Sequence, residues 1–488
     1  MRVHRTDDSP VADPPRTRPS LPTRNLPDVM PASEPSARAE CIGPLPEAAH
    51  GWPAGITPTP EFATVRAFMA GGEGSLFITG RAGTGKSTLL RALRAAGAEN
   101  MAIVAPTGLA AVNVGGQTIH SFFSLPPKLI LPEDIRRSRN GGVMRKLDFL
   151  VIDEVSMVRA DLMHGIDLAL RLNRGRQRDP FGGLRLLLFG DLHQLPPVVQ
   201  EGEVAAYLDE TYGGPFFFGV PALMEGAGTQ RIELQHVFRQ RDEALLQVLN
   251  SIREGNAGTQ ELSLLNERVR PIRTLSEGDP YVILTPTNQA AQRINTAFLS
   301  AIPGEAFTYP ASVTGEFNPA ASPTDPTLVL KAGAKVILLR NDGERRWVNG
   351  TIARVARLEE KRIWVEIAGK EHEVEPAAWE NRRYAYDRAQ EKVVETIAGT
   401  FRQFPLRLAW ALTIHKSQGL TLDKVYIDLG RGTFAHGQTY VALSRCRTLD
   451  GLALARPITE NDVLFDPAAT RYRDIFDELR AAPLGQLR

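Results

Sequence analysis

The chain carries Gly80-Arg81-Ala82-Gly83-Thr84-Gly85-Lys86-Ser87 directly after the apolar run 75–79 and at the start of a helical stretch, 86–96. Glycines in such a loop let backbone N–H groups curl around phosphate oxygens, and the N-terminus of the following helix adds its positive end. In this pattern Lys86 reaches the β- and γ-phosphates and the Ser87 hydroxyl ligates Mg²⁺. We therefore expect 80–88, which ends at Thr88, to bind ATP together with Mg²⁺.

The composition of the chain strengthens this interpretation of Lys86. Only ten of the 57 basic residues are lysines, so arginine is used almost wherever either residue would serve. A Gly-rich turn before an ordinary helix would leave a lysine at this position unexplained. Lys416, another of the ten, also falls in a segment dense in motifs.

An acidic pair ends a second apolar run, in Phe149-Leu150-Val151-Ile152-Asp153-Glu154. A strand that ends in two carboxylates beside a phosphate loop places one near Mg²⁺ and leaves the other to activate the attacking water. We assign the first role to Asp153 and the second to Glu154. An acidic pair after a strand otherwise serves as a helix N-cap, and the phosphate loop upstream is what favours catalysis.

Short apolar runs alternate with helical stretches from Phe62 onward, which is typical of a doubly wound α/β sheet. The first set of strand-like runs is 75–79, 102–105, 149–152 and 184–189, and the second is 232–234, 281–284, 408–411 and 424–429. Because 488 residues exceed one core, we expect two tandem domains, one over 56–228 and one over 229–300 and 406–488.

Residues 301–405 have a different pattern, with short alternating strands at 335–339, 346–355, 362–367 and 371–375. Asn341-Asp342-Gly343 and Asn349-Gly350 are hairpin signals between them. This pattern predicts a small β-barrel inserted in the second domain. At the other end, 1–55 holds 11 of the 35 prolines, and we expect a disordered tail there.

Composition excludes several other classes of protein. No run approaches the about 18 apolar residues of a membrane span, and the N-terminus lacks the apolar run of a secretory signal. Only Cys41 and Cys446 are present, so a disulfide framework is excluded. We expect a cytoplasmic protein, nucleoid-associated if bacterial, without a membrane partner. The net charge of +1 means that any nucleic-acid site must be a local groove.

Seven segments of the sequence match known motifs in addition to the phosphate loop. Together with the phosphate loop, and in family order from about Gly80 to Arg447, they resemble the motifs of the Pif/RecD-like helicases, the 5′-to-3′ branch of superfamily 1. Seven motifs in order are specific, although no single one would be. They are Ala105-Pro106-Thr107-Gly108-Leu109-Ala110-Ala111, Thr118-Ile119-His120-Ser121-Phe122-Phe123, Asp153-Glu154-Val155-Ser156-Met157, Gly190-Asp191-Leu192-His193-Gln194-Leu195-Pro196-Pro197, Val237-Phe238-Arg239-Gln240, Thr413-Ile414-His415-Lys416-Ser417-Gln418-Gly419 and Tyr440-Val441-Ala442-Leu443-Ser444-Arg445.

The resemblance implies roles for three more residues. Gln194 would sense the γ-phosphate. Arg239 and Arg445, both expected in the second domain, would act as arginine fingers that stabilise transition-state charge across a domain cleft. ATP would draw the two RecA-like domains together and hydrolysis would release them, which moves the strand in steps.

The resemblance also implies where single-stranded DNA lies. Small hydroxyls, backbone amides and Lys416 suit sugar-phosphate contacts that ignore base sequence. The β insertion would be the SH3-like domain that closes over the strand, and 124–144 the wedge that splits the duplex. The implied DNA-binding residues are Thr107, Gly108, Thr118, His120, Ser121, Thr413, His415, Lys416 and Ser417.

Five aromatic residues near these segments have two interpretations. Phe122 and Phe123 would either stack on bases or pack in the core, and adjacent phenylalanines favour the core. For Trp347, Trp364 and Trp379 of the insertion we also favour packing.

One position departs from the family. Such helicases commonly have a glutamine shortly before the phosphate-loop strand that reads adenine, and Phe62 stands in the approximate place here. We therefore predict relaxed nucleotide choice.

These features predict a monomeric ATP-dependent DNA helicase that moves 5′ to 3′ on single-stranded DNA and unwinds tailed or forked duplexes. DNA repair, recombination and telomere maintenance are family roles that would suit it. Two alternatives stay open. An RNA-directed or protein-remodelling ATPase would use the same phosphate site, since the sequence has no readable 2′-OH sensor. A nucleotide-switched DNA-binding module that does not step would need neither Glu154 nor the two arginines.

Overall fold

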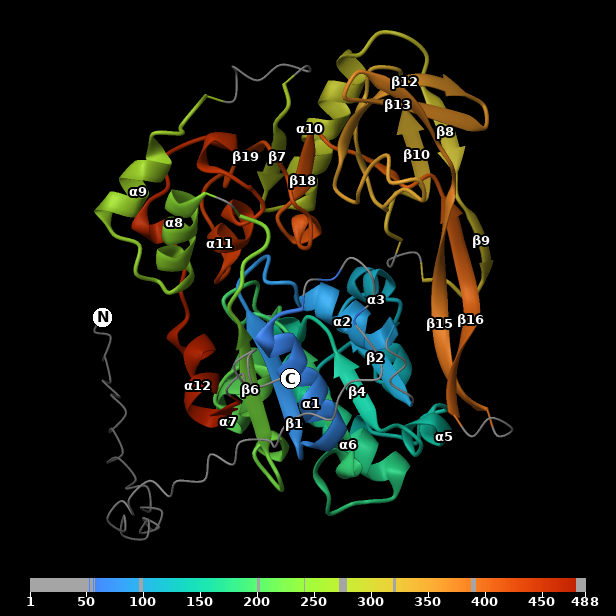
Figure 1. Ribbon diagram of the computed structural model, residues 1–488, viewed down its shortest axis with the longest axis vertical. Helices are drawn as coiled ribbons and strands as arrows, with labels where there is room; N and C mark the ends of the chain where they lie inside the picture. Colours follow the sequence, from blue (N-terminus) through green and yellow to red (C-terminus); the bar gives the residue numbers. More distant parts are fainter. Residues whose placement is uncertain are drawn as a thin grey trace, which may run out of the picture. The chain divides into compact units, whose positions relative to one another are not determined.

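The computed structural model describes residues 52, 56, 58–95, 100–199, 202–240, 242–271, 279–318, 322–387 and 392–479 (Figure 1). The tail expected over 1–55 lies outside these residues, apart from Trp52. None of the helices within the described ranges is long and apolar enough to cross a membrane.

The first sheet is parallel throughout and has the order β21-β6-β1-β5-β4-β2-β3. Strands β1 and β4 are buried along their whole length, and β5 between them is buried except at Arg185, as expected for a parallel sheet covered on both faces. The strands are β1 (Ser75–Gly80), β2 (Met101–Ala105), β3 (Gln117–Thr118), β4 (Phe149–Ile152), β5 (Arg185–Phe189), β6 (Thr229–Leu234) and β21 (Asp477–Glu478).

Local sequence signals start and end the helices of this sheet. Pro60 follows the N-cap Thr59, whose hydroxyl accepts the N–H of Phe62 at 3.4 Å, and Gly175 ends the longest helix with a φ of 72°. The helices are α1 (Pro60–Gly71), α2 (Lys86–Ala95), α3 (Gly108–Val114), α4 (Ile119–Phe123), α5 (Gly141–Met144), α6 (Ala160–Arg174), α7 (Glu203–Tyr212) and α12 (Tyr472–Ile475).

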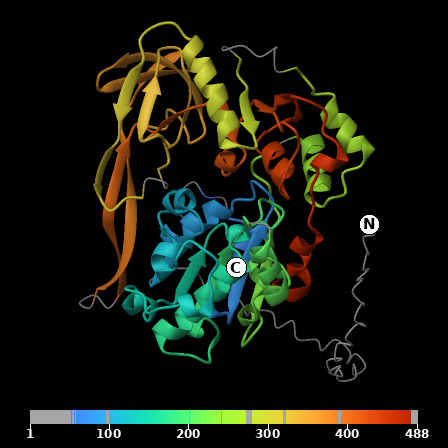
Figure 2. The same cartoon turned by 180° about the vertical axis from the view of Figure 1, so that it is seen from behind.

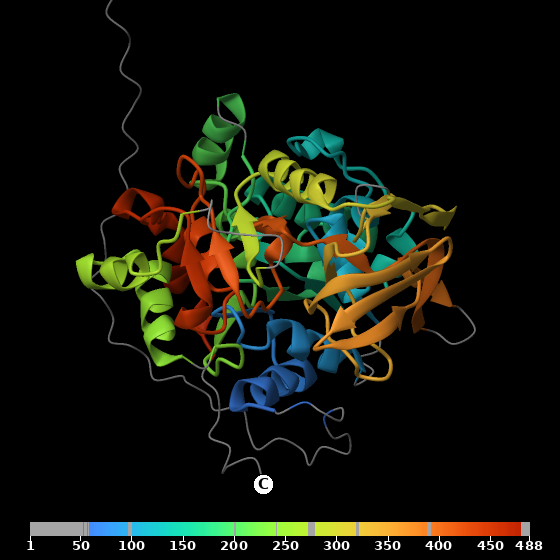
Figure 3. The same ribbon diagram turned by 90° about the horizontal axis from the view of Figure 1, so that it is seen from above.

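A second parallel sheet has the order β18-β7-β19-β20, with strands coloured from yellow-green to red in Figures 2 and 3. It has its own apolar core. Its strands are β7 (Val282–Thr285), β18 (Ala411–Thr413), β19 (Val425–Ile427) and β20 (Leu452–Leu454). Its helices are α8 (Glu243–Arg253), α9 (Thr259–Asn266), α10 (Asn288–Ala301) and α11 (Gln438–Leu443). The α/β core with two parallel sheets agrees with the expected tandem arrangement.

Between β7 and β18 the chain forms antiparallel strands with a separate core around Trp347 and Trp410. One sheet has the order β14-β13-β12-β11-β17. A second consists of β10 and β8, and a third has the order β15-β16-β9. The strands are β8 (Phe307–Pro310), β9 (Ser312–Gly315), β10 (Thr327–Leu330), β11 (Lys335–Leu338), β12 (Ile352–Glu359), β13 (Arg362–Ile367), β14 (Lys370–Val374), β15 (Ala377–Asp387), β16 (Lys392–Gln403) and β17 (Leu406–Leu408).

Strands β15 and β16 form a long two-stranded arm that reaches the first sheet (Figure 1). The buried Tyr384 hydroxyl accepts the N–H of Ile103 at 2.9 Å, and Glu395 pairs with Arg94 at 2.6 Å. Strand β3 has only two residues and pairs with Val104 and Ala105 of β2. The arm therefore bonds the backbone of β2 at Ile103, which a longer β3 would otherwise pair.

Three expectations from the sequence are wrong in detail. The run 232–234 lies in β6, which pairs with β1 in the first sheet, so the boundary expected at 229 is too early; β21 likewise returns the C-terminal segment to that sheet. The run 408–411 divides between β17 and β18, which belong to different sheets. Residues 346–351 are a loop, in which Arg346 pairs with Asp342 at 2.7 Å. Apolar runs identify strands but do not say which sheet receives them.

Candidate nucleotide-binding active site

The phosphate loop connects β1 to α2 and requires its glycines. Gly83 and Gly85 have φ values of 86° and 89°, in the region that side chains rarely adopt. A Cβ at Gly83 would lie 2.5 Å from the Cβ of Arg239, and one at Gly85 would lie 3.3 Å from the Phe62 ring. The loop is therefore shaped both by its own backbone and by the segment that follows β6.

Lys86 lies at the first position of α2 and folds back on the loop. Its Nζ donates to the Gly80 carbonyl and, at 3.1 Å, to the Arg81 carbonyl. Burial lowers the pKa of Lys86, while the carboxylates of Asp191 and Glu154 act in the opposite direction. The ammonium group therefore lies among oxygens that a phosphate could replace as its partners.

Asp153 and Glu154 follow β4, as the sequence predicts. Burial raises the pKa of both carboxyl groups, and the nearby charge of Glu154 raises that of Asp153 further. Glu154 has a φ of 50°, which is uncommon for a residue other than glycine and places its side chain where the strand ends. Two consecutive acids, one buried and one half-buried, favour the binding of a cation.

Gln194 and Asp191 lie in the turn after β5. The Gln194 Nε2 donates to Asp191 Oδ2 at 3.1 Å, and the Gln194 backbone N–H donates to the Asp191 carbonyl at 2.9 Å. Arg253 of α8 pairs with Asp191 at 3.5 Å and with Glu233 at 3.2 Å. Arg253 and Lys86 hold the pKa of the Asp191 carboxyl at about 2, so Asp191 stays ionised and fixes the Gln194 amide.

The two predicted arginine fingers are both within the site. Arg445, fully buried after α11, donates to the Val441 carbonyl at 2.9 Å and to Ser444 Oγ at 2.7 Å. Burial and the charge of Arg239 lower the pKa of Arg445 to about 9, and burial lowers that of Arg239 to about 10. Both remain protonated at neutral pH. Arg239 lies in the connection from β6 to α8, and its guanidinium donates to the carbonyls of Ser444 and Gly419, each at 3.4 Å.

A cavity of about 760 Å³ brings the predicted catalytic residues together. Lys86, Glu154, Gln194, Arg239 and Arg445 all line it, as do the loop residues Ala82, Gly83, Thr84, Gly85, Lys86, Ser87 and Thr88. Gly80, Arg81 and Asp153 are not lining residues within the described part of the chain. Motifs spread over 360 residues of sequence therefore converge on one cavity because the carboxyl ends of β1, β4 and β5 share one edge of a parallel sheet.

Other residues line the cavity as well, and the sequence places one of them, Phe62, near the nucleotide, where relatives have an adenine-reading glutamine. Phe238 is 43% exposed beside the loop, and its N–H donates to the Gly83 carbonyl at 2.9 Å. Phe62 is buried, and its ring and that of Phe238 both approach Gly85. Phe238 belonged to a quoted motif, but nothing in the sequence set it apart from the neighbouring Arg239. The remaining unpredicted lining residues are Ile56, Arg91, Gly419, Thr421, Arg447 and Thr448.

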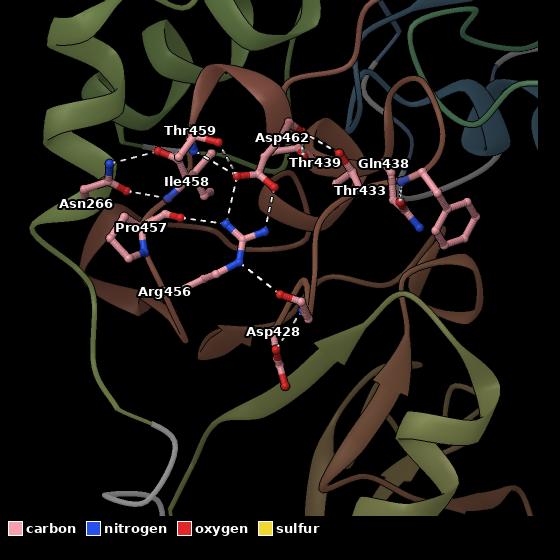
Figure 4. A network of polar contacts seen from close by, with 12 residues as sticks. Asn266, Asp428, Thr433, Gln438, Thr439, Arg456, Pro457, Ile458, Thr459 and Asp462 are labelled. Atoms are coloured by element: carbon pink, nitrogen blue, oxygen red, sulfur yellow. Dashed lines mark hydrogen bonds and ion pairs between the residues drawn. The ribbon is translucent and has the colours of Figure 1, made fainter.

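A polar network anchors α11, the helix that precedes Arg445 (Figure 4). Asp462 accepts from both terminal nitrogens of Arg456, at 2.8 and 2.6 Å, and from Thr459. Its carbonyl accepts the hydroxyls of Thr433, at 2.9 Å, and of Thr439, the second residue of α11. The bonds from Arg456 hold the pKa of the Asp462 carboxyl at about 2.

The expected DNA contacts of the first sheet are at its edge strands. Thr107 follows β2 and Thr118 ends β3, and the two strands pair so that Ala105 is opposite Thr118. Both hydroxyls are N-caps, accepting the N–H of Ala110 and of Ser121 at 3.2 Å. Gly108 begins α3, Ser121 is exposed, and burial lowers the pKa of the half-buried His120.

In the second sheet the expected contacts follow β18, and only one side chain is freely exposed. Lys416 is exposed, and His415 is half-buried with a pKa that burial lowers. Thr413 is buried and its hydroxyl accepts the N–H of Lys416 at 3.2 Å, while the fully buried Ser417 donates to the Ile414 carbonyl at 2.7 Å. The Ser417 hydroxyl is thus used inside the protein, contrary to the expectation of a strand contact.

The aromatic residues pack as favoured. Phe122 and Phe123 are buried, with Phe122 5.8 Å from the Tyr384 ring. Trp347, Trp364 and Trp379 are also buried, and Arg357 lies 3.7 Å above the Trp364 ring.

The fold and the site together define a P-loop nucleotide hydrolase with two parallel α/β sheets. The PIF1-like helicase family matches residues 62–261. The Pif1 ATP-dependent DNA helicase of Bdellovibrio bacteriovorus is 34% identical over 433 residues, covering 86% of this chain and 92% of that protein. The human PIF1 ATP-dependent DNA helicase is 32% identical, covering 84% of this chain and 61% of its own length.

A solved structure agrees with these relatives. The Pif1 helicase from Bacteroides in complex with ADP-AlF3 and single-stranded DNA superposes with a TM-score of 0.62 at 36% identity, over 86% of this chain and 97% of that one. The chain belongs to the PIF1-like helicase family and is therefore a helicase, an enzyme that couples nucleotide hydrolysis to strand separation.

Proposed function

We propose that this helicase hydrolyses Mg-ATP to move 5′ to 3′ along single-stranded DNA, and that it unwinds tailed or forked duplexes as it moves. ATP-dependent DNA helicase activity is the function that its relatives carry by name, and roles in DNA repair, recombination and telomere maintenance are in keeping with that family. The direction of movement rests on the resemblance to the 5′-to-3′ branch.

One observation carries the proposal, which is that Lys86, Glu154, Gln194, Arg239 and Arg445 line one cavity. A lysine and two arginines would stabilise the charge that develops on the transferred phosphoryl group. Glu154 would accept the proton of the attacking water, and a carboxyl with a raised pKa is well matched to that step. Gln194, fixed by Asp191, would orient the same water or report the γ-phosphate.

The residues fit Mg²⁺, which we include in the proposal. Burial raises the pKa of both carboxyl groups, and the charge of Glu154 raises that of Asp153 further, so a divalent cation beside them would offset negative charge. The Ser87 hydroxyl and Asp153 would hold the ion. Mg²⁺ takes few protein ligands and keeps several waters, so a hydroxyl and one carboxylate are a sufficient donor set.

The DNA path is proposed to cross both sheets. Thr107, Gly108, Thr118, His120 and Ser121 would contact the strand at the edge of the first sheet. Lys416 and the backbone around it would contact the strand on the second. The antiparallel insertion would form the SH3-like barrel that closes over it, and 124–144 the wedge. A monomer would be sufficient for stepping, and sedimentation of the DNA complex tests that part.

Relaxed nucleotide choice is the remaining part of the proposal. The rings of Phe62 and Phe238 meet at Gly85, so a base bound there would meet aromatic carbon, which attracts every base by stacking. We expect kcat/KM for GTP within about 10-fold of that for ATP, since no single hydrogen-bonding side chain discriminates. Discrimination above 100-fold in steady-state hydrolysis would refute this part alone.

The first experiment is steady-state ATP hydrolysis with and without single-stranded DNA, with Glu154→Gln as the control. Stimulation by DNA that vanishes in the variant would support a DNA-driven motor, and unwinding of 5′-tailed but not 3′-tailed duplexes would support the direction. Stimulation by RNA instead, or a rate indifferent to both, would favour an RNA-directed or protein-remodelling ATPase. Nucleotide-dependent DNA binding without turnover would favour a switched binding module.

A further inference from the structure

Tyr440 forms a direct bond between the second sheet's helix α11 and the phosphate loop. Its hydroxyl accepts the backbone N–H of Ala82 at 2.9 Å, across 358 residues of sequence. Both residues are buried, with Tyr440 3% and Ala82 7% exposed. Burial raises the pKa of the Tyr440 phenol to about 12, so the group is neutral at working pH.

The partner of this hydroxyl, the Ala82 N–H, lies directly before the left-handed turn of the phosphate loop at Gly83. Ala82 precedes Gly83, whose φ of 86° turns the backbone toward Arg239. The Gly83 carbonyl is held separately by the N–H of Phe238 at 2.9 Å. Tyr440 and Phe238 thus bond two peptide groups of the loop from outside it, 81–82 and 83–84, with one peptide group between them.

These contacts form a closed circuit. Gln240, two residues after Phe238, donates from Nε2 to the Ser444 carbonyl at 2.9 Å, and Ser444 precedes Arg445. Helix α11 connects Arg445 back to Tyr440. The start of the helix is fastened in turn by the Thr439 hydroxyl, which donates to the Asp462 carbonyl (Figure 4).

We propose that Tyr440 is a positioning residue of the active site, whose hydroxyl ties the shape of the phosphate loop at Ala82 to the helix that places Arg445. This inference rests on the proposed function, because it assigns a part of the same site. A displacement of α11 would reach the loop amides directly through this bond, and a change in the loop on nucleotide binding would reach Arg445 by the same route. Tyr440 touches the loop rather than the reacting atoms.

The physical reason is preorganisation. Backbone amides stabilise phosphate charge without reorganisation cost only when they are already oriented. Gly85, Lys86 and Ser87 are oriented by the start of α2, whereas Ala82 lies before the helix and depends on its external partner. Loss of the hydroxyl should therefore lower kcat more than it changes nucleotide affinity.

The experiment compares Tyr440→Phe with Tyr426→Phe in the full chain. Tyr426 is a matched control, because it is also fully buried in the second sheet's core and its hydroxyl donates to the Arg270 carbonyl at 2.7 Å, away from the phosphate loop. Burial raises its pKa to about 12 as well. We expect Tyr440→Phe to lower kcat for ATP about 10-fold with KM within twofold, since a buried donor loses its partner. Tyr426→Phe should stay within twofold of the parent on both constants.

A second pair of measurements separates positioning from folding. Tyr440→Phe should bind ADP as the parent does but bind ADP with aluminium fluoride about 10-fold more weakly, which a purely structural loss would not produce. If Tyr440→Phe fails to fold, Thr439→Val is the second variant. It keeps the Tyr440 hydroxyl but removes the bond from Thr439 to the Asp462 carbonyl that fastens α11, and it should lower kcat at unchanged KM. Equal kcat in Tyr440→Phe and Tyr426→Phe, or no loss in Thr439→Val, overturns the inference. A parent chain that hydrolyses no ATP would instead refute the proposed function.

Discussion

The two parallel sheets are built alike but end their strands differently. After β2 and after β7 the chain continues with Pro-Thr and a helix, and the threonine caps that helix: Thr107 accepts the N–H of Ala110 at 3.2 Å, and Thr287 that of Ala290 at 3.3 Å. The first sheet adds the phosphate loop after β1 and the acidic pair after β4. The second sheet, within the residues that the structure describes, has no counterpart of either.

What the second sheet contributes instead is positive charge and a fixed helix. Arg253 from α8 pairs with Asp191 and Glu233, and Arg445 lies after α11 within the cavity. The acids of the first sheet, like the phosphate expected beside them, are negatively charged and need positive charge nearby. Arg253 and Arg445 of the second sheet supply part of it. The site is complete only when both are in place, which is the arrangement that a nucleotide-driven motor requires.

The largest expected effect lies in the first sheet. Glu154→Gln should lower kcat about 10³-fold because the general base is lost, and Lys86→Ala should abolish turnover in a folded protein. Since the two act as one unit, the double variant should be little worse than Lys86→Ala. Steady-state hydrolysis with circular dichroism checks this. Multiplicative losses would contradict a single catalytic cluster.

The matching change on the second sheet is Arg445→Lys. It keeps the charge but loses the guanidinium geometry that bonds Val441 and Ser444, so kcat should fall about 10²-fold. Arg431→Lys, an exposed arginine of the same half, is the control and should hydrolyse ATP at the parent rate. An unchanged rate in Arg445→Lys would leave the first sheet as the only catalytic region.

Removal of the Asp462 carboxylate, which bonds Arg456 and Thr459, should affect stability. Asp462→Asn should lower the free energy of unfolding by about 2 kcal/mol at pH 7, the value of hydrogen bonds to a charged group. The pKa of Asp462 in the folded protein is about 2, below its ordinary 3.8, so this stabilisation is present above about pH 4 and is lost as pH falls toward 2. Urea unfolding at pH 7 and pH 3 measures both values.

The control for this prediction is Asp450→Asn, whose side chain is 85% exposed beside Arg268. An exposed ion pair contributes little, so its unfolding should hardly change. Equal losses in the two variants at both pH values would mean that the Asp462 carboxylate contributes no more to stability than an exposed ion pair.

The smallest effect is expected on DNA affinity. Lys416→Ala should weaken single-stranded DNA binding a few-fold and reduce the slope of log K against log salt by about 0.7, because one phosphate contact is lost. Ser417→Ala removes a buried hydroxyl that bonds Ile414, so it should leave the slope unchanged. Fluorescence anisotropy over a salt series distinguishes the two, and a slope change in Ser417→Ala would place that side chain on the strand.

Much of the site was predictable because its chemistry is local in sequence. The loop 80–88 and the pair Asp153-Glu154 are contiguous, and their strand contexts are short-range signals. Sheet membership was not predictable in the same way. The run 232–234 pairs with β1 through contacts made by distant residues, and periodicity carries no information on the partner strand.

The side-chain roles divide in the same manner. Thr107 and Thr118 sit at motif positions, and their hydroxyls cap helices, which motif spacing alone does not reveal. Ser417 had the residue type of a phosphate contact, and only the packing around it turned its hydroxyl inward.

The sequence by itself determined which residues we expect at the nucleotide site, since a glycine loop, a lysine and two acids next to strand ends are contiguous patterns. Only the tertiary structure decided that Tyr440 holds Ala82, that Arg253 holds Asp191 and that Arg445 is buried with them. Those pairs join residues tens to hundreds of positions apart. Their contacts arise from the packing of one sheet's helices on another sheet's loops, a relation that no local pattern encodes.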